Sequence, residues 1–425
     1  MTRLRLAGAD TFRSFRHRNF RVYFWGQAVS QIGTWLQFIA QTLLVLRLEG
    51  TATALGLLTA LQFLPVLLLG PFAGLVADRF DKRHIMYVTQ SVMILPALVL
   101  GVLTVTGHIT TLGVFVLATV AGIGNTFDNP PRRVILSELV DESDVPNAVS
   151  LNSTLMTGAR LVAPAFAAGL IATVGIGWCF IVNALSFIGG LIAVRMLDTS
   201  KMHAVPSVPR SKHQVRDGLS YLWSDRELRL AMTMMAVVST LAFNWQVVLP
   251  IFARSTLGGS EGSYLFLSVG LSIGSLVGAL AVARRRTITL VQVTKMGLGA
   301  GLSMLVLAAA PSLGVAFVVG LAAGGFAIAY LSSTASLLQV RATPAMRGRV
   351  MALQAVVFLG STPIGGPLAG WVTQQHGARV GLLLGAIPTL VAGAATWWAI
   401  RRTPIETPDE TLAAVGADGL LPVAA

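Results

Sequence analysis

Charged residues are scarce in this 425-residue chain. Asp, Glu, Lys and Arg make up only 12% of it, whereas hydrophobic residues make up 54% and the mean hydropathy is +0.73. A soluble domain carries about twice that charged fraction, so a soluble fold is excluded. A β-barrel is disfavoured, because its strands would alternate apolar and polar residues over about ten positions. Here apolar runs of about 20 residues recur instead, which is typical of membrane helices.

Cysteine is nearly absent as well. Cys179 is the single one, which excludes a disulfide framework within the chain and a metal site built from several cysteines. There is no Walker phosphate loop, no nucleophile-plus-base set and no cluster of metal ligands. We therefore expect neither an enzyme nor an ATP-driven pump, and no cofactor. The six histidines lie in predicted loops or tails, so none is placed to carry a proton at the membrane midplane.

Positive charge is present in excess, and its distribution matters. The formal net charge is +13 and the pI is about 11.1, which could indicate a nucleic-acid partner. The basic residues, however, form tight clusters at the ends of apolar runs, where membrane proteins use them to set orientation. We therefore expect a lipid bilayer around the chain and no nucleic acid.

The apolar runs predict an all-α membrane protein with twelve transmembrane helices in two six-helix halves. The expected spans are about 20–46, 53–77, 85–106, 110–131, 147–173, 176–197, 228–253, 262–283, 288–310, 312–336, 349–374 and 378–400. The expected organisation is a tail at 1–19, halves at 20–197 and 228–400, a polar central loop at 198–227, and a disordered tail at 401–425. After about residue 212 the loop pattern favours an amphipathic helix with Leu219, Leu222 and Trp223 on one face.

Lys and Arg predict the orientation. With an even number of spans both termini share one side, and that side collects nearly all the basic residues. The opposite loops hold only Arg47, Arg254 and Arg379. This bias predicts that the termini and the central loop are cytoplasmic.

Matching motifs indicate an internal repeat. The block "GPFAGLVADRFDK" aligns with "GSLVGALAVARRR" at a shift of 204 residues, which places Gly74 on Gly278. The block "APAFAAG" aligns with "GPLAGWV" at a shift of 203, which matches Pro164 with Pro367. Two matches at nearly one offset predict duplicated halves around a central cavity, an architecture used by secondary transporters.

The loop between the second and third spans carries a more specific pattern. It reads Gly74-x-x-x-Asp78-Arg79-x-x-Lys82-Arg83 and resembles the signature loop of the major facilitator superfamily. "GIG" at 122–124 and "GARLVAPAFAAG" resemble further motifs of drug and metabolite exporters in that superfamily. The stretches "NPPRRVILSELVDESDVPNAVSLNS" and "RATPAMRGRVMALQ" resemble the subgroup that contains bacterial enterobactin (siderophore) exporters and secretion effectors.

The resemblance implies roles for several small residues and departs from the family pattern at three places. Hinge or helix-packing positions are implied for Gly122, Gly124, Pro164, Gly169, Gly278 and Pro367. The signature loop usually has Gly where this chain has Asp81, and Asp is one of the better substitutes where φ must be positive. Span four lacks the Arg that proton-coupled drug exporters place before Gly-x-Gly, and span five has Ala-Pro for Gly-Pro. The last two differences argue against a proton-driven drug antiporter as a specific identification.

Asp78 is the signature-loop residue that orientation does not explain, because acids contribute little to it. Gly70 and Gly74 leave a bare helix face, and Asp78 continues that face one turn further. An acid there can interact with the positive N-terminal end of another helix. The resemblance implies that this helix is span eleven, near Gly348, so that the contact closes the cytoplasmic side. The alternative is that all the loop charges only set orientation, and we favour that reading for Arg83.

Two further charges fall inside predicted spans. Asp128 lies about one turn inside span four and needs a partner or a proton. We predict Lys82 as that partner, the alternative being a solvated helix end. Arg160 lies about 13 residues, roughly 20 Å, into span five, and a charge at that depth is a functional candidate. It favours an anionic or oxygen-rich substrate group, unless it only bonds helix carbonyls near Pro164.

Uncharged polar residues predict a substrate cavity. Gln27, Gln31, Thr34 and Gln41 share a narrow sector of span one, and amides inside a membrane must face protein or water. Asn244 and Gln354 occupy comparable positions on other spans. Together with Arg160 they predict an amphipathic cavity for a mid-sized organic molecule. For any single Gln, a hydrogen bond between helices is the alternative.

The sequence as a whole predicts an exporter in the bacterial cytoplasmic membrane. The resemblance implies a monomer that moves a siderophore, drug or related metabolite by alternating access, with proton antiport as the expected driving force. The alternatives are uptake of an anionic metabolite, or a membrane sensor or assembly partner that keeps the fold without transporting.

Overall fold

The computed structural model describes residues 12–203, 214–285 and 287–402. Within these ranges the side chains of Pro71, Asp78, Gln214, Val215 and Ala345 lie outside the description. The predicted disordered tail from 403 onward, residues 1–11 and residues 204–213 of the central loop also lie outside the described residues.

The described chain is helical and holds twelve helical segments long and apolar enough to cross a membrane, so the predicted twelve-span all-α fold is confirmed. The first half consists of α2 (Arg18–Leu48), α3 (Ala52–Arg79), α4 (Lys82–Val105), α5 (Thr111–Glu138), α6 (Val145–Thr173) and α7 (Gly177–Arg195). The second half consists of α9 (Arg226–Leu241), α10 (Trp245–Ile251), η4 (Phe252–Thr256), α11 (Glu261–Ala283), α12 (Leu290–Ala309), α13 (Leu313–Arg341), α14 (Pro344–Gly360), α15 (Thr362–His376) and α16 (Ala378–Arg402).

Short elements occupy one end of the bundle, which we call the basic end because the Lys and Arg clusters lie there. They are η1 (Arg13–Arg16), η2 (Glu142–Asp144), η3 (Thr199–Lys201) and α8 (Gln214–Ser224). The predicted amphipathic helix is therefore present as α8. Of its three predicted apolar residues, Leu222 is buried, whereas Leu219 and Trp223 are about half exposed.

The opposite end, here the far end, is closed by tight turns. Gly50, Gly107, Gly175, Gly258 and Gly377 lie in its connections, and all five have positive φ, between 65° and 96°. Glycine adopts this backbone conformation without the steric cost that other residues meet. Threonine side chains then start the next helix, as Thr51 does for α3 and Thr110 for α5.

Two predicted continuous spans are in fact broken. Span seven is interrupted between α9 and α10, where the Asn244 side-chain amide donates to the Thr240 carbonyl at 2.8 Å. Span eleven is interrupted at Ser361 between α14 and α15, just before Pro363. The two breaks are neighbours, because the rings of Phe243 and Phe358 are 5.4 Å apart.

Span four is longer than predicted. The expected end was 131, but α5 continues through Pro130 and Pro131 to Glu138. Prolines usually end a helix because they lack an N–H and clash with the preceding turn. Here Asp128 consequently lies ten residues from the end of α5, about 15 Å, and not one turn inside it.

The end of the predicted N-terminal tail is packed onto the basic end. Ser14 is buried, and its hydroxyl donates to the Asn147 side chain at 2.7 Å. The carboxylate of Asp144 pairs with Arg13 at 2.5 Å and with His17 at 2.9 Å. Residues 12–17 therefore form part of the first half.

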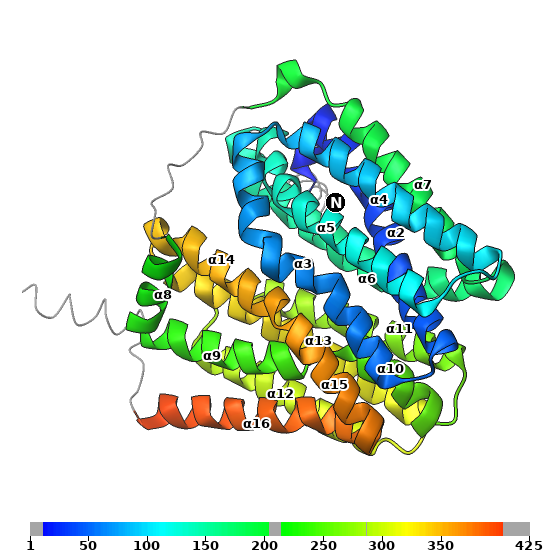
Figure 1. Ribbon diagram of the computed structural model, residues 1–425. Helices are drawn as coiled ribbons and strands as arrows, with labels where there is room; N and C mark the ends of the chain where they lie inside the picture. The colour runs from blue at the N-terminus through cyan, green and yellow to red at the C-terminus, as the bar shows by residue number, and fades with distance from the viewer. Residues whose placement is uncertain (1–11, 204–213, 286, 403–425) are drawn as a thin grey trace, which may run out of the picture.

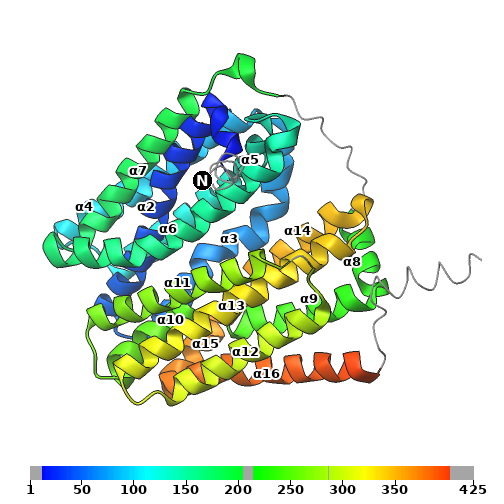
Figure 2. The ribbon, with the colours of Figure 1, turned by 180° about the vertical axis from the view of Figure 1, so that it is seen from behind.

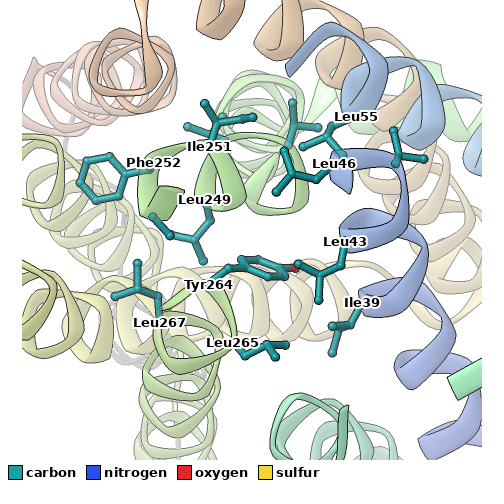
Figure 3. Close-up of a cluster of buried hydrophobic side chains, with 14 of the residues drawn as sticks. Ile39, Leu43, Leu46, Leu55, Leu249, Ile251, Phe252, Tyr264, Leu265 and Leu267 are labelled. Carbon is teal, nitrogen blue, oxygen red and sulfur yellow. The ribbon is translucent and has the colours of Figure 1, made fainter. Parts of the chain in front are cut away.

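The two halves converge at the far end and diverge toward the basic end (Figure 1), and the view from behind shows the same arrangement (Figure 2). The buried apolar clusters follow this pattern. One large cluster at the far end draws residues from both halves, including Leu43 of α2, Leu249 of α10 and Tyr264 of α11 (Figure 3). The clusters at the basic end each belong to a single half.

Candidate functional site

The far-end contact joins the halves through backbone packed against backbone. A side chain at Gly56 of α3 would place its Cβ only 2.6 Å from the carbonyl oxygen of Gly366 on α15. A Cβ added at Gly370 would lie equally close to the Ala52 carbonyl oxygen. Glycines therefore allow α3 and α15 to pack without intervening side chains, and these two helices run side by side in Figure 1.

Charge reinforces the same contact. Arg47 at the end of α2 donates two hydrogen bonds of 2.6 Å to the carboxylate of Glu261 at the start of α11. The Ala52 N–H donates to the Gln374 side chain at 2.9 Å. A two-pronged arginine–carboxylate pair fixes orientation as well as distance, so the halves are held in register here.

Sequence reasoning missed these contacts, although a signal was present. Arg47, Arg254 and Arg379 are the three bases that the orientation rule does not explain. In the structure Arg254 donates to the Leu46 carbonyl at 3.4 Å and Arg379 to the Ala310 carbonyl at 3.0 Å. Each base on the disfavoured side thus has a structural partner.

The halves are apart at the basic end. A Cβ added at Gly70 of α3 or at Gly348 of α14 would meet no described atom of another element within 4 Å. The side chain of Asp78 lies outside the described residues. The predicted contact between Asp78 and span eleven therefore stays a prediction, for a conformation in which these ends have come together.

The signature loop has a local structural role. Asp81 is the N-cap of α4, where its carboxylate accepts from the His84 N–H at 3.0 Å. Partial burial opposes its ionisation, but this hydrogen bond and the charge of Arg83, 3.4 Å away, lower the pKa of the Asp81 carboxyl. Its φ of −58° needs no glycine-like freedom, so the substitution at this position is explained by helix capping and not by a positive φ. Arg79 is exposed.

The predicted pairing of Lys82 with Asp128 is wrong. Lys82 pairs with Glu138, with 2.9 Å between its Nζ and the carboxylate oxygen. The reason is the length of α5: Lys82 opens α4 and faces the end of α5, where Glu138 lies, whereas Asp128 is about 15 Å further in. Asp128 does have a basic partner, but on its own helix.

Asp128 belongs to a buried cluster that joins three helices. It is 2% exposed, forms an ion pair with Arg132 one turn along α5, and accepts from the Thr89 hydroxyl of α4 at 2.7 Å. Arg132 also donates to the side chain of Gln27 on α2. Each charge is satisfied within the cluster, as a buried pair requires. The spacing of Asp128 and Arg132 at i, i+4 was the available signal.

Arg160 lies where the halves meet. Its guanidinium stacks over the Trp35 ring of α2, 4.3 Å from the centroid, and its backbone carbonyl accepts from Ser272 of α11 at 3.5 Å. Among the described residues it forms no salt bridge, and its side chain forms no hydrogen bond to the carbonyls near Pro164. The charge is therefore stabilised by an aromatic face, and Trp35 is a partner that sequence reasoning missed.

The structure does not bring the predicted cavity residues together. Gln27 belongs to the Asp128 cluster, and Arg160 lies against Trp35. Gln31, Gln354 and Asn244 are distributed over both halves. Asn244 lines a small separate hollow at the break in span seven. Thr34 and Gln41 line one hollow together, which lies inside the first half.

Most of the predicted packing positions are at close helix contacts. Cβ atoms at Gly122, Gly124 and Gly278 would collide with α3, α4 and α13 respectively. Pro164 is buried in α6, and Pro367 lies against Gly56. A Cβ at Gly169 would meet no described atom of another element within 4 Å, so Gly169 is not at a close contact here, and its hinge or packing role stays a prediction. Gly74 is half-buried.

Twelve spans in two halves, which meet at one end and separate at the other, are the architecture of a transporter of the major facilitator type. The chain belongs to the transmembrane secretion effector family, whose model matches residues 9–414. It is therefore a transporter and not an enzyme.

Several relatives are named as efflux proteins or transporters. The chain is 27% identical over 379 residues to the multidrug efflux pump Tap of Mycobacterium tuberculosis, covering 85% of this chain and 88% of that one. It is 22% identical to macrolide efflux protein A of Streptococcus pyogenes, covering 87% and 94%. It is 24% identical to the staphyloferrin A transporter of Staphylococcus aureus, where the match spans 60% of this chain and 64% of that one.

Solved structures share the fold. A bacterial homologue of the human lysosomal transporter Spinster, in an inward-facing and unoccupied conformation, superimposes with a TM-score of 0.72 at 15% identity and covers 92% of this chain and 98% of that one. The nucleoside transporter NupG gives 0.65 at 13% identity and covers 89% and 98%. At these identities the likeness shows the fold alone.

Proposed function

We propose that this chain exports small organic molecules from the bacterial cytoplasm by alternating access, in exchange for protons. The observation that carries the proposal is the asymmetry of the two ends. The halves are joined by the far-end contact and separate at the basic end, as in one of the two states that alternating access requires.

The orientation follows from the basic residues. Because Lys and Arg gather on cytoplasmic loops, the basic end is the cytoplasmic end and both termini lie there. The conformation described is then open to the cytoplasm and sealed toward the outside. A substrate entering from the cytoplasm would meet Arg160 and Trp35 where the halves join.

The relatives support export over uptake. The macrolide and multidrug proteins match most of this chain and are named for efflux, and Arg160 adds a positive site that suits an anionic or oxygen-rich group. Proton coupling is supported by one feature, the buried carboxylate of Asp128. An ion pair with Arg132 that opens and closes can exchange a proton as it does so.

The test is a flux assay on inside-out vesicles that contain the purified chain, with an imposed proton gradient and a pH-sensitive dye. Erythromycin, ethidium and a citrate-type siderophore form the panel. We expect at least one of them to accumulate and to dissipate the gradient in proportion to its concentration, whereas vesicles without the chain do neither.

Two results would contradict the proposal in different ways. If the solute accumulates equally with and without the proton gradient, the proposed proton coupling is refuted and the proposed export stands. No movement of any solute, in a preparation that folds, would favour a membrane sensor with the same fold.

A further inference from the structure

The first half contains a polar hollow of its own, which we call the N-half pocket. It is enclosed by α2, α3, α4, α5 and α7, and its empty space, counting its open mouth, is about 380 Å³. Its polar wall is formed by Thr34, Gln37, Gln41, Gln62, Asn125 and Asn183. Phe38, Phe187 and Met93 are among the apolar side chains that complete it.

Apart from the Thr34 hydroxyl, the polar wall is made of amides, and it carries no ionisable group. Two pairs of amides are bonded to each other: Gln62 donates to Gln41 at 2.8 Å, and Asn183 donates to Gln37 at 2.7 Å. In each pair one residue comes from α2 and the other from a different helix. These hydrogen bonds fix the orientation of the side-chain amides, so the amide N–H groups that take no part in them have defined positions.

One fully buried donor in this wall has no described partner. The side-chain Nε2 of Gln41 is buried, and the residue is only 2% exposed, yet no described atom accepts a hydrogen bond from it. If the oxygen and nitrogen positions of both side-chain amides were swapped, Gln41 would donate to Gln62. The free N–H₂ would then belong to Gln62, which lines the same pocket. Buried donors in folded proteins are almost always paired, with protein or with ordered water, so this pocket offers a position for a hydrogen-bond acceptor.

We infer that the N-half pocket binds an uncharged, oxygen-bearing group of the transported molecule, such as a ketone, ester, ether or hydroxyl. An anion is disfavoured, because no cationic side chain lines the pocket. The enclosed room is that of about one or two water molecules, so a single oxygen atom with the carbon that bears it fits, and the rest of the molecule stays outside. The inference rests on the proposed transport of small organic molecules and specifies one part of them.

Aromatic rings next to the pocket agree with this assignment. Phe38 lines the pocket and lies parallel to Phe63, at 6.1 Å and 9°. Phe38 is also 5.6 Å from Trp35, over which Arg160 lies. A molecule with its oxygen in the pocket can therefore extend along these rings toward the charge of Arg160.

The experiment measures equilibrium binding of two probes to the purified full chain in lipid nanodiscs. Erythromycin is rich in neutral oxygens, whereas ethidium is an aromatic cation without any oxygen. In Gln41→Leu/Gln62→Leu both members of the pair become apolar, so no amide is left without a partner. We expect the Kd of erythromycin to rise about three- to tenfold, the effect of one neutral hydrogen bond, and the Kd of ethidium to stay unchanged.

Thr42→Val is the matched control. Thr42 is buried beside Gln41 on α2 but bonds only the Phe38 carbonyl of its own helix, at 3.0 Å, and we expect both affinities to be unchanged. If the double variant does not fold, Gln41→Asn withdraws the free N–H₂ by one methylene and is measured in the same way.

Three results would overturn the inference. The first is a parallel change for both probes, which would mean general distortion. The second is no change for either, which would mean that water alone fills the pocket. The third is a wild-type chain that does not bind erythromycin. Because binding is measured without a gradient, intact binding with no flux in vesicles would refute the proposed function and leave the pocket as a binding site for a neutral oxygen.

Discussion

Asp128 and Arg132 form a buried ion pair on one face of α5, and it matters that both charges are present. Asp128→Asn leaves Arg132 without its counter-charge, and removing one partner of a buried pair costs about 3–5 kcal/mol. We expect a clear fall in the thermal unfolding temperature of the purified protein. The double variant Asp128→Asn/Arg132→Gln removes both charges and should regain most of that loss.

The vesicle assay separates this structural role from coupling. If Asp128 exchanges the transported proton, the double variant should be stable and bind substrate, yet show no proton-linked flux. Equal instability of the single and double variants would contradict the pairing, and normal proton-linked flux in the double variant would contradict the coupling role.

Arg160 and Trp35 supply a different kind of contact, a charge held by an aromatic face. Arg160→Ala should abolish transport with normal membrane insertion. Trp35→Leu should raise the KM about tenfold, because a desolvated cation–π contact is worth about 1–2 kcal/mol. Normal efflux by Arg160→Ala would show that this charge has only a structural role.

At the scale of helices, sequence reasoning succeeded where the physical signal is local. Runs of about 20 apolar residues predicted all twelve spans, mostly within a few residues, because a bilayer sets the length of a helix. The end of α5 was misplaced because Pro130 and Pro131 are a strong local signal that tertiary packing overrides. The break between α14 and α15 was missed because hydrophobicity continues across it.

The site was less predictable because partners depend on tertiary structure. Asp128, Arg160 and Gln41 were recognised as unusual from their chemistry and depth. Their partners Arg132, Trp35 and Gln62 are set by the register between helices, which periodicity does not report. The pair of Arg47 and Glu261 joins residues 214 positions apart, and sequence reasoning had no means of aligning them.

The α3–α15 contact gives a prediction at this scale. Gly56→Ala places a methyl group 2.6 Å from the Gly366 carbonyl, which forces the helices apart and should disfavour the state closed at the far end. Gly70→Ala is the control on the same helix, since its Cβ position is open. Cysteines introduced at the far end should react faster with an impermeant thiol reagent in Gly56→Ala only. Equal reactivity in both variants would refute this account.

Replacing Asp78 should shift the equilibrium between the two conformations in the opposite direction. If its carboxylate holds α3 against the start of α14 in the outward-open state, Asp78→Asn should insert normally but weaken that state. Cysteines at the basic end would then react faster and those at the far end more slowly. Unchanged reactivity at both ends would leave the signature loop with orientation and helix capping as its only roles.

At the scale of the whole molecule, the two ends are built differently. The far end combines glycine backbone packing, one arginine–glutamate pair and an apolar cluster shared by both halves. At the basic end each half keeps its own apolar core. The halves can therefore separate there without exposing a shared core, whereas separation at the far end must break one.

The measurement that tests this account most directly is a pair of distances between spin labels. Cys179 is the single cysteine, so Cys179→Ala provides the background. One pair joins exposed Phe80 and Arg347 at the basic end, and the other joins exposed Thr106 and Gln375 at the far end. The account predicts that substrate with a proton gradient populates a second state in which the first distance shortens as the second lengthens. Distances that stay fixed, or that change in the same direction, would contradict alternating access by this chain.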